Sequence, residues 1–193
     1  MKKYPIVLSI AGSDSSGGAG IQADIKTMSA IGVFATTVIT AITAQNTTGV
    51  TAIQGISPDI VGKQIEAVFS DLHPKAVKIG MLFSKEIIEV VASNLERYKP
   101  RHIILDPVMI STSGSRLISE DAIDTLRNRL FPIATVITPN KMEAEYLAGI
   151  SINGIEDISN VAKQILSYGG NAVLIKGGHF DCHTMTDYLI DKD

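Results

Sequence analysis

The chain has 193 residues, of which 45% are hydrophobic and 19% are charged, and its formal net charge is −3. This length and composition predict one globular domain with a sizeable core, and the absence of a Lys/Arg run argues against nucleic-acid binding. The single cysteine, Cys182, excludes an intramolecular disulfide, and the apolar stretch after Pro5 is too short for a signal peptide or membrane span, so we expect a cytoplasmic protein that acts on a small molecule.

Strands and helices alternate through the first half of the chain. Apolar, β-rich runs predict strands at Ile6–Ala11, Val38–Ala44, Val50–Ile56 and Ala76–Ile79. Helical spacing predicts a helix at Ile21–Ile31, with Ile21, Ile25 and Met28 as its apolar residues. A second helix begins at Ser57-Pro58-Asp59, because an N-cap serine, a proline at the first helical position and an early acid favour a helix start. Its expected buried residues are Val61, Ile65, Val68 and Leu72.

The second half continues the alternation. Ser84 is expected to cap a helix with Ile88, Val91 and Leu95 on its apolar side, and Ser119 to cap one that carries Leu126 and Leu130. Two further helices are predicted at Lys141–Ala148 and Ile158–Leu166. The predicted strands are His102–Leu105, Thr135–Thr138, Ala172–Ile175 and Met185–Ile190.

Continuous apolar strands that alternate with amphipathic helices predict an α/β fold, a mainly parallel sheet in a three-layer α/β/α arrangement. Polar and glycine-rich residues follow the ends of these strands. They are Gly12–Gly20, Gln45, Met81, Asp106, Asn140 and Lys176–Gly178. Because parallel strands end at one edge of a sheet, where ligands bind, we expect these segments to form one site.

The loop Gly12–Gly20 is a strand-to-helix connection whose glycines allow close backbone approach and whose helix N-terminus offers N–H groups to an anion. It lacks the Lys and Ser/Thr of a P-loop, and a simple tight turn is the alternative. Asp24 lies on the apolar arc of the following helix, so it needs a partner or a ligand; a salt-bridged or edge-exposed aspartate is the alternative.

Gln45 offers a donor and two acceptor lone pairs, so it can recognise a heteroaromatic edge with an amine beside a ring nitrogen; capping the strand end is the alternative. Asp106 suits Mg²⁺ held through water, or a turn before Pro107. Asn140 and Glu143 offer oxygen ligands for Mg²⁺, although the same pair is an ordinary capping box. Lys176 enters a double-glycine turn as a natural phosphate partner. The spacing of His179, Cys182 and His183 fits no standard zinc pattern.

Taken together, these motifs resemble the bacterial hydroxymethylpyrimidine/phosphomethylpyrimidine kinases of thiamine biosynthesis, within the ribokinase-like superfamily. The segments that carry the resemblance are Ala11–Thr27, Ile39–Ala41, Ala44–Thr47, Lys78–Leu82, Leu105–Met109, Ile137–Asn140 with Glu143 and Ala144, and Lys176–His179. The resemblance runs through the whole chain in order. Ser15 departs from it, because the family commonly has proline after the loop aspartate.

The resemblance implies ATP and Mg²⁺ as cofactors and two successive phosphorylations, of the pyrimidine's hydroxymethyl group and then of the monophosphate. It implies a substrate site at Gly12, Asp24, Gln45, Met81 and Val108, with the amino edge at Gln45 and the hydroxymethyl group near Asp24. The ATP residues it implies are Lys176, Asn140 and Gly178, and the residues for Mg²⁺ are Asp106 and Glu143.

The family's catalytic anion hole, a Gly-Thr-Gly-Cys segment, follows the part that matches Lys176–His179. We therefore expect residues 1–193 to form a ribokinase-like domain without its C-terminal portion, with the anion hole and base beyond Asp193 and impaired turnover. A pyridoxal kinase of the same fold and a non-catalytic pyrimidine- or nucleotide-binding module are the alternatives. We also expect a homodimer.

Overall fold

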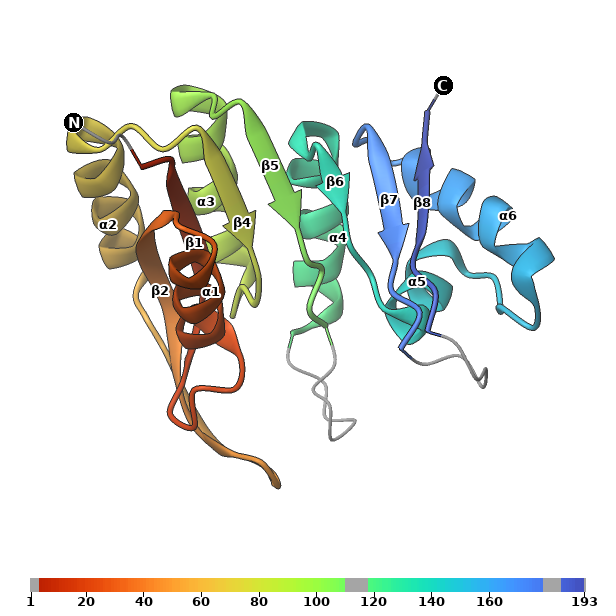
Figure 1. The fold of residues 1–193 in the computed structure, drawn as a ribbon, viewed down its shortest axis with the longest axis horizontal. Helices are drawn as coiled ribbons and strands as arrows, with labels where there is room; N and C mark the ends of the chain where they lie inside the picture. Colours follow the sequence, from red (N-terminus) through yellow and green to blue (C-terminus); the bar gives the residue numbers. More distant parts are fainter. Residues whose placement is uncertain (1–3, 110–117, 179–184, 193) are drawn as a thin grey trace.

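Alternating strands and helices form one mixed sheet with helices packed on it (Figure 1), in a computed structural model that describes residues 4–109, 118–178 and 185–192. The strands are β1 (Ile6–Asp14), β2 (Phe34–Asn46), β3 (Gly49–Gly55), β4 (Ala76–Ile79), β5 (His102–Leu105), β6 (Val136–Ile137), β7 (Ala172–Ile175) and β8 (Tyr188–Asp191). The helices are α1 (Gly20–Ala30), α2 (Pro58–Asp71), α3 (Lys85–Tyr98), α4 (Glu120–Arg129), α5 (Lys141–Ala148) and α6 (Ile155–Leu166), with a 3₁₀ turn at Phe131–Ile133.

The sheet has the strand order β3-β2-β1-β4-β5-β6-β7-β8. All pairs from β2 to β7 are parallel, and the two outermost pairs, β2–β3 and β7–β8, are antiparallel. Parallel neighbours need long crossover connections, which α1, α3 and α4 provide, whereas Thr47 and Thr48 suffice to join β2 to β3. The mainly parallel sheet predicted from the sequence is confirmed.

Helices cover both faces of the sheet. Helix α1 packs on β1 and β2 in front of the sheet in Figure 1, whereas α2, α3 and α4 lie behind it and contact one another in that order. Helix α6 contacts β7 and β8. The three-layer α/β/α arrangement is therefore confirmed, and no helix in the described part of the chain is long and apolar enough to cross a membrane.

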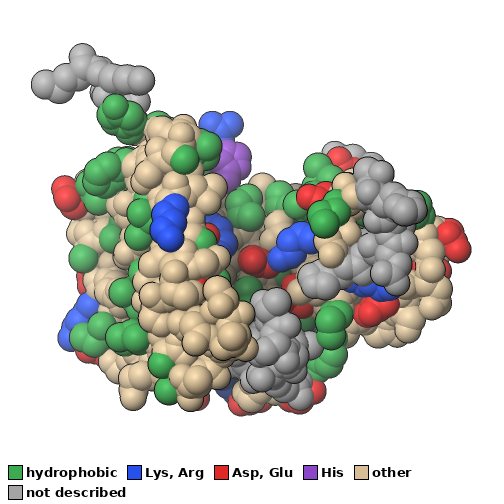
Figure 2. Space-filling view, turned by 60° about the horizontal axis from the view of Figure 1, so that its bottom comes forward, with side chains coloured by type: hydrophobic (Ala, Val, Ile, Leu, Met, Phe, Trp, Pro, Cys, Tyr) green, Lys and Arg blue, Asp and Glu red, His purple; other side chains and the backbone are tan. Residues whose placement is uncertain are grey.

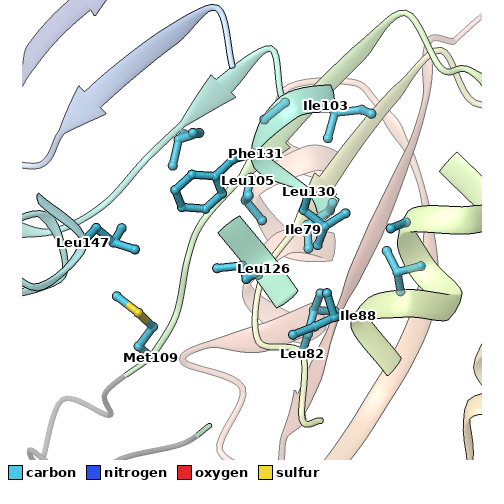
Figure 3. Close-up of a cluster of buried hydrophobic side chains, with 14 of the residues drawn as sticks. Ile79, Leu82, Ile88, Ile103, Leu105, Met109, Leu126, Leu130, Phe131 and Leu147 are labelled. Atoms are coloured by element: carbon cyan, nitrogen blue, oxygen red, sulfur yellow. The ribbon is translucent and has the colours of Figure 1, made fainter. Parts of the chain in front are cut away.

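The core lies between the sheet and the helices behind it. Ile79, Leu105 and Ile137 are paired across adjacent parallel strands, so their side chains share one face, and all three are fully buried. Figure 3 shows Ile79 and Leu105 in one cluster with Leu126 and Leu130. Burial of such side chains contributes roughly 1.5–3 kcal/mol each, so this cluster fixes the strands whose ends form the site.

Two predicted helix caps are confirmed and one is not. The Oγ atoms of Ser57 and Ser84 accept hydrogen bonds from the N–H groups of Ile60 and Ile87, both at 3.4 Å. Ser119 occupies the N-cap position of α4, but its Oγ donates to a carboxylate oxygen of Asp121 instead of accepting from the helix backbone. The position was predicted correctly and the bond was not.

Several predicted boundaries were wrong. Strand β1 continues through Gly12 to Asp14, because it stays paired with β2 up to Thr43. Strand β2 begins four residues earlier than predicted, where Phe34 pairs with Ile6. Strand β6 shrinks to two residues, α6 begins three residues early, and β8 starts at Tyr188 instead of Met185. These ends depend on pairing and packing with distant segments, which local propensity does not encode.

Two predicted core positions also need correction. In α2 the third fully packed position is Phe69, whereas Val68 and Leu72 are only partly buried. In α1, Ile25 is 37% exposed, because this helix has the sheet on one side and no described helix packed on its other side.

Candidate active site

The carboxyl ends of the parallel strands meet at one edge of the sheet, at the bottom of Figure 1. Asp106 follows β5, Asn140 follows β6 and Lys176 follows β7. Asn140 and Lys176 form a parallel β-bridge, and the N–H of Lys176 donates to the carbonyl oxygen of Pro139 at 2.9 Å. The topology thus brings together segments that lie up to 70 residues apart in the sequence.

A cavity of about 300 Å³ opens at this edge, between the glycine loop, α1 and the ends of β2, β4 and β5. All five residues expected to bind the substrate line it, namely Gly12, Asp24, Gln45, Met81 and Val108. Asp106 lines it as well, whereas Asn140, Glu143, Lys176 and Gly178 do not. Figure 2 shows acidic and basic side chains close together in a hollow on this side of the molecule.

The glycine loop is closed by its own carboxylate. Asp14 is only 3% exposed, and its Oδ2 accepts hydrogen bonds from the N–H groups of Gly18 at 3.0 Å and Ala19 at 2.8 Å. Its Oδ1 accepts from the N–H and the Oγ of Ser16, both at 2.8 Å. The N–H groups of Gly18 and Ala19, which precede α1, are therefore bonded to Asp14 and are not offered to an external anion. The expectation for the N–H groups of the helix itself stays a prediction.

These contacts decide the ionisation of Asp14. Burial opposes the charged form, but the hydrogen bonds from Ser16, Ala19 and Gly18 outweigh it and hold the pKa of Asp14 below its ordinary value. The loop therefore contains a permanent negative charge at neutral pH.

Two glycines lie where this loop makes close approaches. Gly20, at the start of α1, has φ +56°, and a Cβ there would overlap the carbonyl oxygen of Gly12. A Cβ on Gly12 would lie 2.7 Å from the Cε of Met81 across the cavity wall. Gly20 therefore requires glycine for close backbone approach, as the sequence predicted, whereas a Cβ at Gly12 would displace only the flexible end of Met81.

Asp24 has partners on two neighbouring strands. Its Oδ2 accepts a hydrogen bond from the Oγ of Ser9 at 2.5 Å and lies 3.0 Å from the Nζ of Lys78. Ser9 and Lys78 are paired residues of β1 and β4, so both point to the α1 side of the sheet. The salt-bridge interpretation of Asp24 is confirmed, and the same carboxylate also faces the cavity.

Gln45 sits beside a β-bulge at the end of β2. Its backbone N–H and carbonyl both bond to the Oγ of Ser15, at 2.9 and 2.6 Å, and its Oε1 accepts from the Oγ1 of Thr43 at 3.2 Å. The strand end is thus held through the Gln45 backbone, which leaves the side-chain amide on the cavity wall.

The ends of β5, β6 and β7 carry an ionic cluster. Lys176 Nζ donates to Asp106 Oδ1 at 2.7 Å. Asn140 Oδ1 accepts from the N–H of Glu143 at 2.9 Å, and Glu143 Oε2 accepts from the N–H of Asn140 at 2.8 Å, so the capping box is confirmed.

Glu143 is 2% exposed, and burial raises its pKa above the ordinary value of 4.5. Hydrogen bonds from the N–H groups of Asn140 and Met109 and the charge of Lys176 oppose this rise, whereas the charge of Asp106 adds to it. The two acids are therefore electrostatically coupled, and a cation near them would favour the ionised form of Glu143.

In the part of the chain that the structure describes, no group of three or more His, Cys, Asp or Glu side chains is placed to hold a metal ion. Asp106 Oδ1 is engaged by Lys176, and Glu143 accepts from the N–H groups of Asn140 and Met109. Carboxylate oxygens of this kind fit Mg²⁺ that keeps most of its waters, and they do not form an all-protein cage. His179, Cys182 and His183 lie outside the described residues.

Sequence reasoning placed Asp14 only within the segment Gly12–Gly20, without a role of its own, and it gave Ser9 and Lys78 no role in the site. A signal was present for two of them: Ser9 and Lys78 are the polar residues inside the otherwise apolar runs Ile6–Ala11 and Ala76–Ile79. A buried polar residue in a central strand needs a partner, and the two share Asp24.

Comparisons with known proteins agree with this architecture. Residues 14–193 match the family model described as phosphomethylpyrimidine kinase. A hydroxymethylpyrimidine/phosphomethylpyrimidine kinase of Rhizobium meliloti is 52% identical over 189 residues, which cover 97% of this chain and 71% of the relative.

Solved structures extend the likeness to three dimensions. The phosphomethylpyrimidine kinase of Clostridium difficile has a TM-score of 0.90 and 52% identity, covering 98% of this chain and 81% of that one. An ADP complex of Bacillus subtilis pyridoxal kinase has a TM-score of 0.89 and 34% identity, covering 99% and 72%. With the family model matching nearly the whole chain and half of all aligned residues identical to such a kinase, the chain belongs to the phosphomethylpyrimidine kinase family.

Proposed function

We propose that the protein phosphorylates 4-amino-5-hydroxymethyl-2-methylpyrimidine and then its monophosphate, giving the diphosphate used in thiamine biosynthesis. The observation that carries this proposal is the convergence of Gly12, Asp24, Gln45, Met81 and Val108, from four separate segments, on one cavity. At about 300 Å³ the cavity is at the small end of ligand sites, which suits a single substituted ring.

In this proposal Gln45 binds the amino edge of the pyrimidine. Its amide can donate to the ring nitrogen and accept from the exocyclic amine, a pairing that a purely apolar wall could not offer. Met81 and Val108 supply apolar contacts to the ring. Asp24 accepts a hydrogen bond from the hydroxymethyl group and so orients the oxygen that is to be phosphorylated.

A kinase needs a phosphoryl donor nucleotide, and we propose ATP with Mg²⁺. Lys176, Asn140 and Gly178 would contact the nucleotide, and Asp106 and Glu143 would hold Mg²⁺ through its waters. When bound, Mg²⁺ supplies positive charge that neutralises the donor's phosphates. The Lys176–Asp106 ion pair is the natural resting state of this region, since phosphate oxygens can replace the carboxylate as partners of the lysine.

Pyridoxal kinase activity is the second candidate, favoured by the similarity to the Bacillus subtilis enzyme. Both reactions phosphorylate a hydroxymethyl group on a nitrogen heterocycle. A non-catalytic pyrimidine- or nucleotide-binding role is the third candidate. The cytoplasmic location and the homodimer expected from the sequence stay predictions.

The test is release of ADP from MgATP with the pyrimidine, its monophosphate or pyridoxal as acceptor. We expect kcat/KM for the pyrimidine to exceed that for pyridoxal. A preference for pyridoxal would support the second candidate, and calorimetric binding of the pyrimidine with no ADP release would support the third.

A further inference from the structure

The charges around the cavity are unbalanced for an anionic ligand. Its lining carries three carboxylates, Asp14, Asp24 and Asp106, and Lys78 is the basic side chain among the described lining residues. A phosphate monoester carries a charge of about −1.5 to −2 at neutral pH. Such a ligand would be repelled by this cavity unless a cation inside it were available.

Among these charged residues, Lys78 is placed so that its ammonium group can bond either to Asp24 or to a ligand in the cavity. Its Nζ lies 3.0 Å from Asp24 Oδ2, its side chain is 26% exposed, and it borders the cavity. An ammonium group has three donors that rotate together on a flexible stem, so it can bond to a carboxylate and to a ligand.

Ser9 lowers the free-energy cost to Asp24 of losing Lys78 as a partner. This fully buried serine donates to the same Oδ2 atom at 2.5 Å. When Lys78 turns toward a ligand, Asp24 therefore keeps a hydrogen bond and is not left as an unpartnered buried carboxylate.

We propose that Lys78 is a specificity-determining residue that binds the phosphate of the monophosphate substrate, with Asp24 serving the uncharged alcohol. This inference rests on the proposed function, in which one cavity must accept both ligands. Asp24 and Lys78 then act on different substrates. The Asp24 carboxylate orients the hydroxyl of the alcohol in the first reaction, and the Lys78 ammonium neutralises the phosphate of the monophosphate in the second.

The test is calorimetric binding of the two pyrimidines, which does not depend on turnover. Lys78→Gln is expected to weaken the monophosphate by roughly 10–100-fold, the worth of one hydrogen bond to a charged group, and the alcohol by less than about 3-fold. Lys78→Arg, which keeps the charge, should recover part of the monophosphate affinity. Lys63→Gln, at an exposed lysine on α2, is the control for the change in net charge.

Asp24→Asn separates this role from simple ion pairing. It frees Lys78 and removes a negative charge, so the ratio of monophosphate to alcohol affinity should rise, whereas Lys78→Gln should lower it. If Lys78→Gln does not fold, the double variant compared with Asp24→Asn alone makes the same test, since no unpaired carboxylate remains at position 24.

Equal loss of both ligands in Lys78→Gln, or ratios that move in the same direction in the two variants, would overturn the inference and leave the proposed function standing. A wild-type chain that binds neither pyrimidine would overturn the proposed function and the inference together.

Discussion

At the scale of single residues, the charged groups of the site form hydrogen bonds and ion pairs with one another. Asp14 closes the glycine loop, Asp24 is shared by Ser9 and Lys78, and Asp106 is paired with Lys176. Buried charges that lack partners are costly, so a site with several carboxylates must be internally compensated. Gln45 differs, because its side-chain amide lies on the cavity wall with one long bond to Thr43.

Gln45→Ala is expected to weaken pyrimidine binding by about 1–3 kcal/mol, because one or two hydrogen bonds are lost and ligand groups stay unsatisfied. Binding of an ATP analogue should be nearly unchanged, since Gln45 and Lys176 lie on different strand ends. Isothermal titration calorimetry with both ligands checks this, with Gln54→Ala on β3 as the matched control. Equal losses for the two ligands would contradict the assignment.

Glu143 should leave a signature in the pH dependence of stability. Its pKa is raised in the folded state, so its contribution to stability is fully present below its ordinary pKa of 4.5 and is lost as pH rises through the folded pKa. Each tenfold change in the acid dissociation constant is worth about 1.4 kcal/mol.

Glu143→Gln keeps an acceptor for the capping box but cannot ionise. Measured by urea unfolding from pH 4 upward, the free energy of unfolding of the variant relative to wild type is therefore expected to increase with pH. Glu66→Gln, at an exposed site on α2, is the matched control for the loss of one carboxylate. A difference that stays constant with pH would show that burial of Glu143 does not perturb its ionisation.

At the scale of elements, the sequence predicts where a helix starts. The residue type at the N-cap does not predict which hydrogen bond its side chain makes. Ser84 caps α3 through its Oγ, whereas Ser119, in the same position of α4, bonds to Asp121. An acid two residues later does not by itself decide between these bonds, because Glu86 also hydrogen-bonds to the Ser84 side chain and Ser84 still caps its helix.

Ser84→Ala should therefore destabilise the protein by about 1 kcal/mol, the usual worth of an N-cap. Ser119→Ala should cost less than about 0.5 kcal/mol, because no helix N–H loses its partner. Chemical denaturation of the two variants under the same conditions compares them directly. A larger loss for Ser119→Ala would contradict the geometry at the start of α4.

At the scale of the whole molecule, the surface combines a low net charge with exposed apolar side chains. The isoelectric point is about 5.8, and Ile31, Met185 and Leu189 are 72%, 82% and 64% exposed. Proteins associate most readily where their net charge vanishes, because charge repulsion no longer opposes apolar contacts.

Light scattering of the protein should therefore be greatest near pH 5.8 and fall toward pH 8 at constant low salt. Added salt at pH 8 should raise the scattering, since it screens the remaining repulsion. Scattering that rises from pH 5.8 to pH 8 in low salt would contradict this account.

The sequence by itself determined the features that short stretches of residues encode, namely several element bounds, a capping motif and the order of strands and helices. Strand β4, helix α5 and strand β7 have the predicted bounds, and the Asn140–Glu143 capping box is a local motif that forms as such. The order of strands and helices also implied the parallel sheet, and with it the shared edge at which Gln45 and Asp106 line one cavity. The hydrogen bonds of α5 and its capping box are local, so a pattern of three to four residues suffices for them. The strands were recognised from their short apolar runs, although their hydrogen bonds join distant segments.

Only the tertiary structure decided which charges meet. Lys78 and Asp24 are 54 residues apart and Lys176 and Asp106 are 70 apart, so their pairing depends on sheet register and on the position of α1. The hydrogen bonds from Gly18 and Ala19 to Asp14 likewise depend on the backbone conformation of the glycine loop. Burial raises the pKa of Glu143, whereas hydrogen bonds outweigh burial at Asp14 and lower its pKa. The cost of a charge depends on the solvent and partners around it, which no single stretch of sequence specifies.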